Sequence, residues 1–181
     1  ICKKEDEKKW KENNCFPVDK LPPLVDFEAI FIPDNFEAAT QIAPTLAYYD
    51  IRGGQILGTN LWNNLDLLQG GSGEYLQGSL FLDGFWKDKK TAPVPQFSES
   101  FYSQMGKEPG VFEAFAYDTV GMMVQVIEKE GPSSRESFAS DLSHLKDFPG
   151  VTGNISIKPN RDAIRRLTIL TVDNNRITEL E

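Results

Sequence analysis

Apolar residues in the first half of this chain follow two different spacings. Residues 25–32 are rich in β-branched and aromatic side chains, which is typical of a short strand covered on both faces. Pro33 ends that strand, and apolar residues then recur at helical spacing until Gly53 and Gly54. The positions expected to face a core are Phe36, Ala39, Ala43, Leu46 and Ala47. Residues 55–57 form a second short strand, so the pattern predicts a β-α-β unit.

Polar side chains follow both predicted strands. Asp34 and Asn35 come after the first strand, and Asn60, Trp62 and Asn63 come after the second. In a β-α-β unit the loops after both strands lie at the same edge of the sheet, so we expect these five side chains to converge where open α/β sheets bind ligands. Asp34 and Asn35 have a second interpretation, since either can cap the helix that follows.

The rest of the pattern predicts one more core strand, three consecutive helices and a return to strands. A strand at 78–84 leads into the polar, proline-containing segment 87–95, which indicates a crossing to another part of the fold. Helices are expected at 96–105, at 111–129, and from a cap at Ser133 or Ser134 to Lys146. On the second helix the expected core positions are Phe115, Val120, Met123, Val124 and Ile127. Strands follow at 151–157, 167–172 and 176–180, the last two as an antiparallel pair.

Composition and charge narrow the possible partners. The chain has 181 residues, a net charge of −8 and a pI near 4.8. Nucleic acid and anionic membrane surfaces are disfavoured, because binding phosphate requires a basic face. The sequence has no run of about 18 apolar residues that would span a bilayer. Residues 1–24 combine a mixed-charge run with Pro17, Pro22 and Pro23, and we interpret them as a polar, flexible arm that carries Trp10.

Few residues are available for metal binding or catalysis. Cys2 and Cys15 flank the arm and either form one disulfide or stay free. With His144 as the single histidine, a zinc or iron–sulfur site lacks ligands. The sequence brings no nucleophile, base and orienting group together, and the glycines of segment 70–73 lack the lysine of a phosphate loop. We therefore predict a protein that is not an enzyme and that uses no cofactor or metal.

Several phrases of the sequence occur in an order that resembles a known family. In chain order they are PDN, GTNLWNN, GSLFLDGF, PGVFEAFAYD, DFPGVTGNISI and LTILTVDNNRI. Over residues 25–180 the chain is similar to the carboxyl-terminal half of a type I periplasmic binding protein. The most similar groups are the branched-chain amino-acid receptors and the lipoproteins described as penicillin-binding-protein activators. The resemblance implies an α/β fold, a three-layer sandwich with a mostly parallel, Rossmann-like sheet, present here as a partial fold.

Members of that family have two lobes with a ligand cleft between them. The resemblance implies that residues 25–86 and 150–181 belong to the second lobe, and that the helical residues 87–149 belong with the first lobe. Asp83, Phe85 and Trp86 then lie at the hinge. Most of the first lobe of the family is not in this sequence, so the helices need a substitute partner, for which a second copy of the chain in a homodimer is one candidate.

The resemblance also implies where a ligand binds. The strand-end residues Asp34, Asn35, Asn60, Trp62 and Asn63 come first, and Phe112 and Glu113 contribute from the first lobe. Glu113 is equally explained by a favourable interaction with the dipole of its helix. The amino-acid receptors carry an acidic group where this sequence has the neutral Asn60, which disfavours a branched-chain amino acid as the ligand. Tyr117 and Asp118 are expected to serve packing and hydrogen bonding between the lobes.

The implied function is an extracytoplasmic solute receptor of a transport system, periplasmic or on the outer surface. Its lobes would close on a small polar or amino-acid-like molecule, which a membrane permease then takes up. The alternative is an envelope lipoprotein domain, lipid-anchored in the full-length parent, that binds and activates a peptidoglycan synthase.

Overall fold

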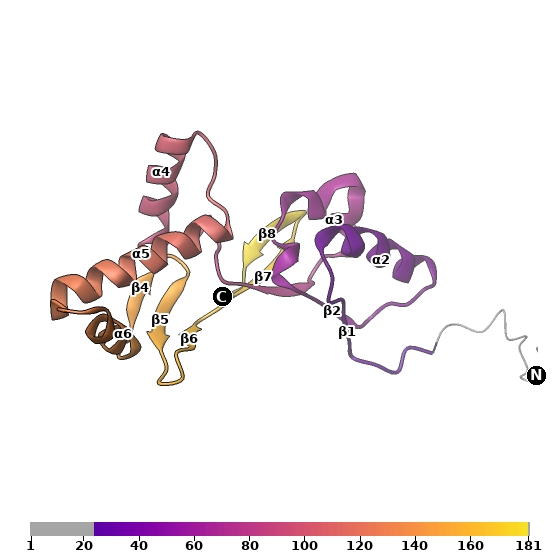
Figure 1. The fold of residues 1–181 in the computed structure, drawn as a ribbon. Helices are drawn as coiled ribbons and strands as arrows, with labels where there is room; N and C mark the ends of the chain where they lie inside the picture. The colour runs from indigo at the N-terminus through magenta and orange to yellow at the C-terminus, as the bar shows by residue number, and fades with distance from the viewer. Residues whose placement is uncertain (1–23, 181) are drawn as a thin grey trace, which may run out of the picture.

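The structure of the protein, a computed structural model, describes residues 24–180 and consists of two parts joined side by side (Figure 1). The first, which we call the sheet part, contains a five-stranded sheet A with α2 (Phe36–Tyr48), the short 3-10 helices η2 (Asn60–Trp62) and η3 (Leu65–Gly71), and α3 (Ser72–Tyr75). The second, which we call the helical part, contains α4 (Val94–Met105), α5 (Val111–Glu130), α6 (Arg135–Ser143) and a three-stranded sheet B. Cys2, Cys15, Trp10 and the predicted arm lie outside the described residues.

Sheet A is mostly parallel, as predicted. Its strands in spatial order are β1 (Ala29–Phe31), β2 (Gln55–Gly58), β3 (Leu80–Asp83), β7 (Thr168–Asp173) and β8 (Arg176–Glu179). The pairs β1–β2 and β2–β3 are parallel, whereas β7 is antiparallel to both of its neighbours. Four of the five strands therefore run in the same direction. The β-α-β unit and the terminal antiparallel pair are both confirmed.

Helices cover one face of sheet A and bury the main core. Ala39 and Ala43 of α2 are almost completely buried against it, as their spacing predicts. The other face is bare within residues 24–180, where Phe31, Leu82 and Ile169 are 59%, 46% and 42% exposed. The predicted α/β class is confirmed, but the strand at 29–31 is covered on one face only, because the described part of the chain supplies no helix on the other side.

Sheet B packs with the helices and not with sheet A. Its strands β4 (Phe148–Gly150), β5 (Gly153–Ile157) and β6 (Ala163–Arg165) are antiparallel to one another. Ile155 of β5 is fully buried in one cluster with Met122 and Val126 of α5 and with Leu145. We expected the chain to return to the second lobe at residue 150. Residues 148–165 stay with the helical part, because their alternating apolar side chains fill the space beneath α5 and α6.

The buried face of α5 is not the one that its apolar spacing predicts. The side chains buried on this helix are Ala114, Asp118, Met122 and Val126. The four predicted core residues Val120, Met123, Val124 and Ile127 are 41–59% exposed, and Phe115 is half-buried. The helix is apolar on both faces, so periodicity alone could not choose between them. The carboxylate Asp118 lies on the face that packs.

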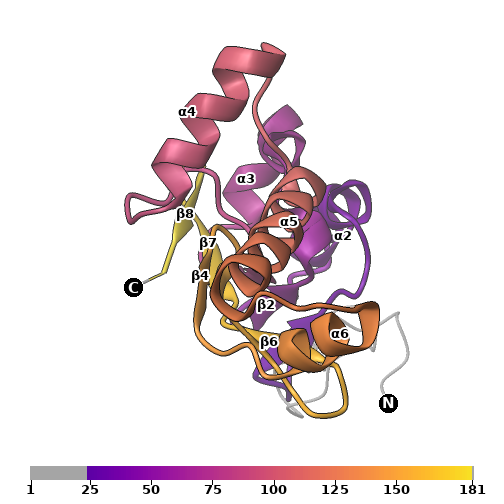
Figure 2. The ribbon, with the colours of Figure 1, turned by 60° about the vertical axis from the view of Figure 1, so that its left-hand side comes forward.

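Two segments connect the parts within the described residues. Residues 84–93 lead from β3 to α4, which agrees with the crossing predicted around 87–95, and residues 166–167 lead from β6 to β7. Figures 1 and 2 show α4 and α6 on opposite sides of α5, with β7 and β8 lying beside the helical part. The two connections place the amino end of α5 next to the carboxyl edge of sheet A.

Candidate functional site

A pocket of about 390 Å³ lies between the two parts at the carboxyl edge of sheet A. Its wall on one side comes from the loops after β1, β2 and β3, and on the other side from the segment that begins α5. Seven of the ten residues predicted for the ligand site or hinge line it. They are Asn35, Asn60, Asn63, Asp83, Phe85, Trp86 and Phe112. Asp34, Trp62 and Glu113 are not among the lining residues.

Trp62 and Asp34 do not line the pocket but hold together the loops that do. The Trp62 side chain is fully buried, and its Nε1 donates to the backbone oxygen of Asp34 over 3.0 Å. The hydroxyl of Thr59 donates to the same oxygen over 3.1 Å. A Cβ at Gly58 would overlap the Trp62 indole, so the strand ends on a glycine where the ring packs. The loops after β1 and β2 are thus joined, as predicted, but Trp62 packs in the core and does not reach the pocket.

Asn35 has both of the roles considered for it. Its Oδ1 accepts from the Ala38 N–H over 3.0 Å and caps α2, while the residue also lines the pocket. The exposed Asp34 carboxylate accepts from the Asn35 N–H over 2.7 Å. The capping interpretation of Asn35 is therefore confirmed, and capping leaves the side chain at the edge of the pocket.

Asn63 and Asp83 form a hydrogen-bonded pair at the start of the first connecting segment. Asn63 Nδ2 donates to Asp83 Oδ2 over 2.7 Å and to the Phe85 carbonyl oxygen over 3.1 Å. Asp83 Oδ1 accepts from the Phe85 N–H over 3.2 Å. Burial raises the pKa of Asp83 above its usual value, against the opposing effect of these hydrogen bonds. The pair therefore links the loop after β2 to the first connecting segment.

Phe112 and Glu113 differ in what they contribute. Phe112 lines the pocket and is 81% exposed. Glu113 instead caps its own helix, since its Oε2 accepts from the Gly110 N–H over 3.0 Å and its Oε1 pairs with Lys107 at 3.2 Å. Hydrogen bonding from its own backbone N–H and then from Lys107 lowers the pKa of Glu113. The structure thus favours the helix-end interpretation of Glu113.

Further lining residues were missed by sequence reasoning. Phe36 and Lys87 each directly follow a predicted site residue, and Asp88 comes one position later, so proximity in the sequence was an available signal. Pro109, Gly110 and Val111 reach the pocket only because the connecting segments bring α5 back to sheet A, and no local pattern encodes that approach.

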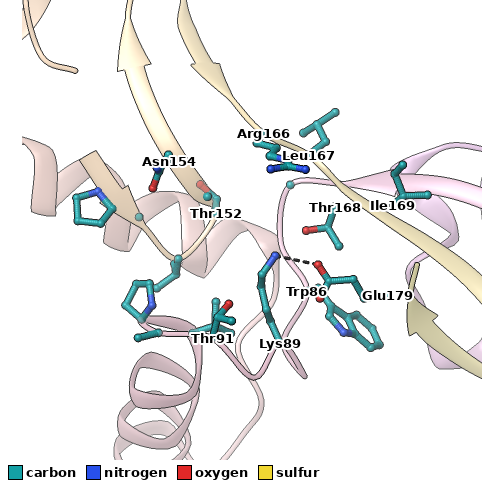
Figure 3. Close-up of a pocket in the computed structure, with 18 of the residues that line it drawn as sticks. Trp86, Lys89, Thr91, Thr152, Asn154, Arg166, Leu167, Thr168, Ile169 and Glu179 are labelled. Carbon is teal, nitrogen blue, oxygen red and sulfur yellow. Dashed lines mark hydrogen bonds and ion pairs between the residues drawn. The ribbon is translucent and has the colours of Figure 1, made fainter. Parts of the chain in front are cut away.

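A second pocket, of about 510 Å³, lies between the two connecting segments (Figure 3). Lys89 of the first segment and Glu179 of β8 form an ion pair across it, with Nζ and Oε1 2.9 Å apart. Thr152 of the helical part and Arg166 of the second connecting segment also line this pocket. Trp86 contributes to both pockets and is 9% exposed, so it forms part of the wall between them.

The described residues that line the pocket carry groups suited to binding. Residues 24–180 contain no group of three His, Cys, Asp or Glu side chains able to hold a metal ion. His144 is exposed at the end of α6, where its Nδ1 lies 2.8 Å from the Ser140 carbonyl oxygen. Over the same range, no helix is both long and apolar enough to cross a membrane. The pocket offers amide, carboxylate and aromatic groups, which suit recognition of a small molecule.

The comparisons with known proteins agree with this architecture. The chain is similar to a leucine-binding protein from Thermotoga maritima, with 27% identity over 85% of this chain and 44% of that one, at a TM-score of 0.65. It is also similar to the substrate-binding protein of a branched-chain amino acid transporter from Streptococcus pneumoniae, solved with isoleucine, with 24% identity over 83% and 42% and a TM-score of 0.62. An ABC transporter substrate-binding protein from Desulfitobacterium hafniense shares 20% identity over 95% and 46%, with a TM-score of 0.66.

The chain spans less than half the length of the solved structures that it matches. A comparison with curated protein sequences gave no match. The family model described as "Periplasmic binding protein", however, matches residues 26–176, which is most of the chain and includes both parts of the structure. With its type I fold and its pocket between two parts, the chain belongs to the periplasmic binding protein family.

Proposed function

We propose that this chain is the ligand-binding portion of an extracytoplasmic solute receptor that serves a membrane transporter. The observation that carries the proposal is that a single pocket takes its walls from both parts of the molecule. A molecule held there contacts the loops of sheet A and the amino end of α5 together, so binding favours the arrangement in which the parts are close. The function is recognition, with no bond made or broken.

The connection between the parts suits such a closing motion. Only residues 84–93 and 166–167 join them within the described range, and domain closure uses short connecting segments of this kind as hinges. Asp83 and Phe85 lie where the first segment leaves the sheet, and both line the pocket. A ligand would therefore contact the hinge directly as well as the two walls.

The ligand that we propose is a small, polar, amino-acid-like molecule. The amide groups of Asn35, Asn60 and Asn63 provide hydrogen-bond donors and acceptors, and Phe36 and Phe112 provide apolar contact area. A volume of about 390 Å³ is of the size that small-molecule sites in proteins have. Relatives named for leucine and for branched-chain amino acids support an amino-acid-like ligand.

Binding can be tested by thermal unfolding and isothermal titration calorimetry against amino acids, amides, amines and short peptides. A ligand at 100 times its dissociation constant should add about 2.7 kcal/mol to the free energy of unfolding. Phe112→Ala should weaken binding of any compound found, whereas Tyr102→Ala, which removes an exposed aromatic ring from α4 outside this pocket, should leave it unchanged. Equal affinities for the two variants would place the ligand elsewhere and overturn the proposal.

The alternative function, activation of a peptidoglycan synthase, makes the opposite prediction for the same titrations. A domain that only docks on an enzyme needs no ligand in its pocket, so no compound of the panel would stabilise it. Stabilisation of the purified synthase on mixing would then identify the chain as an interaction domain. Ligand-induced compaction, measured by small-angle X-ray scattering, would identify it as a receptor.

A further inference from the structure

The Asp83 carboxylate is the buried charge of the pocket between the two parts. It ends β3, it is 4% exposed, and it lines that pocket. Oδ2 accepts a hydrogen bond from Asn63 and Oδ1 accepts one from the Phe85 N–H, and the backbone N–H of Gly84 also acts on the carboxylate. An ionised carboxylate can accept about four hydrogen bonds, so these donors do not saturate Asp83.

No cation compensates this carboxylate within residues 24–180. The ion pairs of the described chain do not include Asp83. The one basic residue among the pocket lining is Lys87, whose Nζ pairs with the Asp88 carboxylate at 2.9 Å. A buried carboxylate without a cation is costly, and a cationic group that enters the pocket would offset that cost.

Aromatic rings surround the same space. Phe36, Phe85, Trp86 and Phe112 all line the pocket. Faces of such rings attract ammonium groups through their quadrupoles, more strongly where water is excluded. Rings and carboxylate together are complementary to an organic cation and unfavourable for an anion, which would meet Asp83 and Asp88 with Lys87 already paired.

The other carboxylates near the carboxyl edge of sheet A are less suited to receive a cationic group. Asp34 lies outside the lining, Glu113 is occupied by the cap of α5, and Asp88 is half-exposed beside Lys87. We therefore propose that Asp83 receives the ammonium group of the ligand and makes the pocket selective for organic ammonium compounds over anions of the same shape. This inference rests on the proposed receptor function, to which it adds the ligand class and the residue that selects it.

The first test compares matched ligands on the unmodified protein. 2-Phenylethylamine, 2-phenylethanol and 3-phenylpropanoate present a cation, a neutral hydroxyl and an anion on nearly the same body. Calorimetric titration should show the amine binding about 10- to 100-fold more tightly than the alcohol, as expected for a hydrogen bond to a charged group, with the acid weakest. This comparison requires no variant and so does not depend on whether a substitution folds.

The second test assigns the preference to a residue. Asp83→Asn should remove the preference for the amine over the alcohol while the alcohol binds about as before. Asp88→Asn is the matched control, because it removes a carboxylate from the same pocket that is paired and partly exposed, and it should change the preference by less than about twofold.

The outcomes separate this inference from the proposed function. A preference for the amine that Asp83→Asn abolishes and Asp88→Asn keeps supports the inference. Binding without such a preference, or a preference unaffected by Asp83→Asn, overturns the inference and leaves the receptor function standing. Failure of every compound in both panels to bind overturns the receptor function and this inference with it.

Discussion

The indole Nε1 of Trp62 donates a hydrogen bond to the backbone oxygen of Asp34 over 3.0 Å. This contact joins the loop after β1 to the loop after β2, and Trp62 is itself fully buried beside Phe81, with ring centroids 6.0 Å apart. The loops that carry Asn35 and Asn60 are therefore anchored to the core of sheet A, and that wall of the pocket is fixed before any ligand arrives.

We expect Trp62→Phe to lower the free energy of unfolding by about 2–3 kcal/mol, because it removes this hydrogen bond and leaves a cavity in the core. Urea denaturation measures the change. Trp86→Phe is the control, since Trp86 is also largely buried but its indole makes no hydrogen bond within residues 24–180. A loss for Trp62→Phe no larger than that for Trp86→Phe would contradict the anchoring role.

The sequence predicts much of sheet A and its edge because the signals there are local. Pro33 and Gly53 mark where the strand and the helix of the β-α-β unit end, and the parallel pairing then places the residues after each strand at one edge. Six of the ten predicted residues line one pocket for that reason, and the seventh, Phe112, was predicted from the family resemblance. Trp62 was expected to line it too, but a large aromatic ring at a strand end serves equally well as core.

What the sequence does not predict depends on contacts between distant residues. Lys89 and Glu179 pair across 90 positions, and the approach of Pro109 to the pocket depends on where the connecting segments lead. The choice of face on α5 fails for a related reason. Both faces are apolar, and the packed one is decided by Asp118, whose partners lie on the turn between β4 and β5.

The two faces of α5 can be distinguished by substitution in the 181-residue chain. Met122 is 8% exposed in a cluster with Ile155, whereas Val124 is 45% exposed. Met122→Ala should cost about 2–3 kcal/mol of stability, within the range for buried residues, and Val124→Ala should stay within about 0.5 kcal/mol. Urea denaturation of both variants gives the comparison. The reverse order would mean that the face predicted from the apolar spacing is the buried one.

Asp118 should be the most sensitive polar position of the helical part. Its carboxylate is 1% exposed and accepts from the Val151 N–H at 2.7 Å, the Thr152 N–H at 2.9 Å and the Thr152 hydroxyl at 2.5 Å. Asp118→Asn points an amide at these donors, so we expect a loss of about 3 kcal/mol. Glu128→Gln, an exposed neutralisation on the same helix, should change stability by less than about 0.5 kcal/mol. Equal effects of the two substitutions would contradict this role.

Asp83 should make stability depend on pH in a defined direction. Its pKa in the folded protein is raised by burial above the usual 3.8, so the folded state holds the proton more tightly than the unfolded state. The stabilisation from protonated Asp83 is fully present below pH 3.8 and is lost as the pH rises through the higher folded-state value. The free energy of unfolding of the wild type minus that of Asp83→Asn should therefore fall as the pH rises from 3.8 through the folded-state pKa of Asp83.

The other titratable groups that line the pocket are Lys87 and Asp88, so the control is Asp88→Asn measured over the same pH range. Asp88 is paired with Lys87 and partly exposed. The free energy of unfolding of the wild type minus that of Asp88→Asn should therefore not show the decline with pH that is expected for Asp83→Asn. Urea denaturation at intervals from pH 3.5 to about pH 7 provides both curves. A difference for Asp83→Asn that rises with pH would show that the folded state favours the ionised carboxylate.

The Lys89–Glu179 ion pair links the first connecting segment to β8, and both side chains are 33% exposed. A double-mutant cycle with Lys89→Ala and Glu179→Ala should give a coupling of about 0.2–1 kcal/mol in low salt, and 1 M salt should reduce it, because a partly exposed pair is screened. Arg52 and Asp50, 3.8 Å apart and 74% and 77% exposed, form the control pair, for which we expect no measurable coupling. A coupling between Lys89 and Glu179 that is as small as that of the control pair, or that does not respond to salt, would mean that the pair does not hold the first connecting segment to β8.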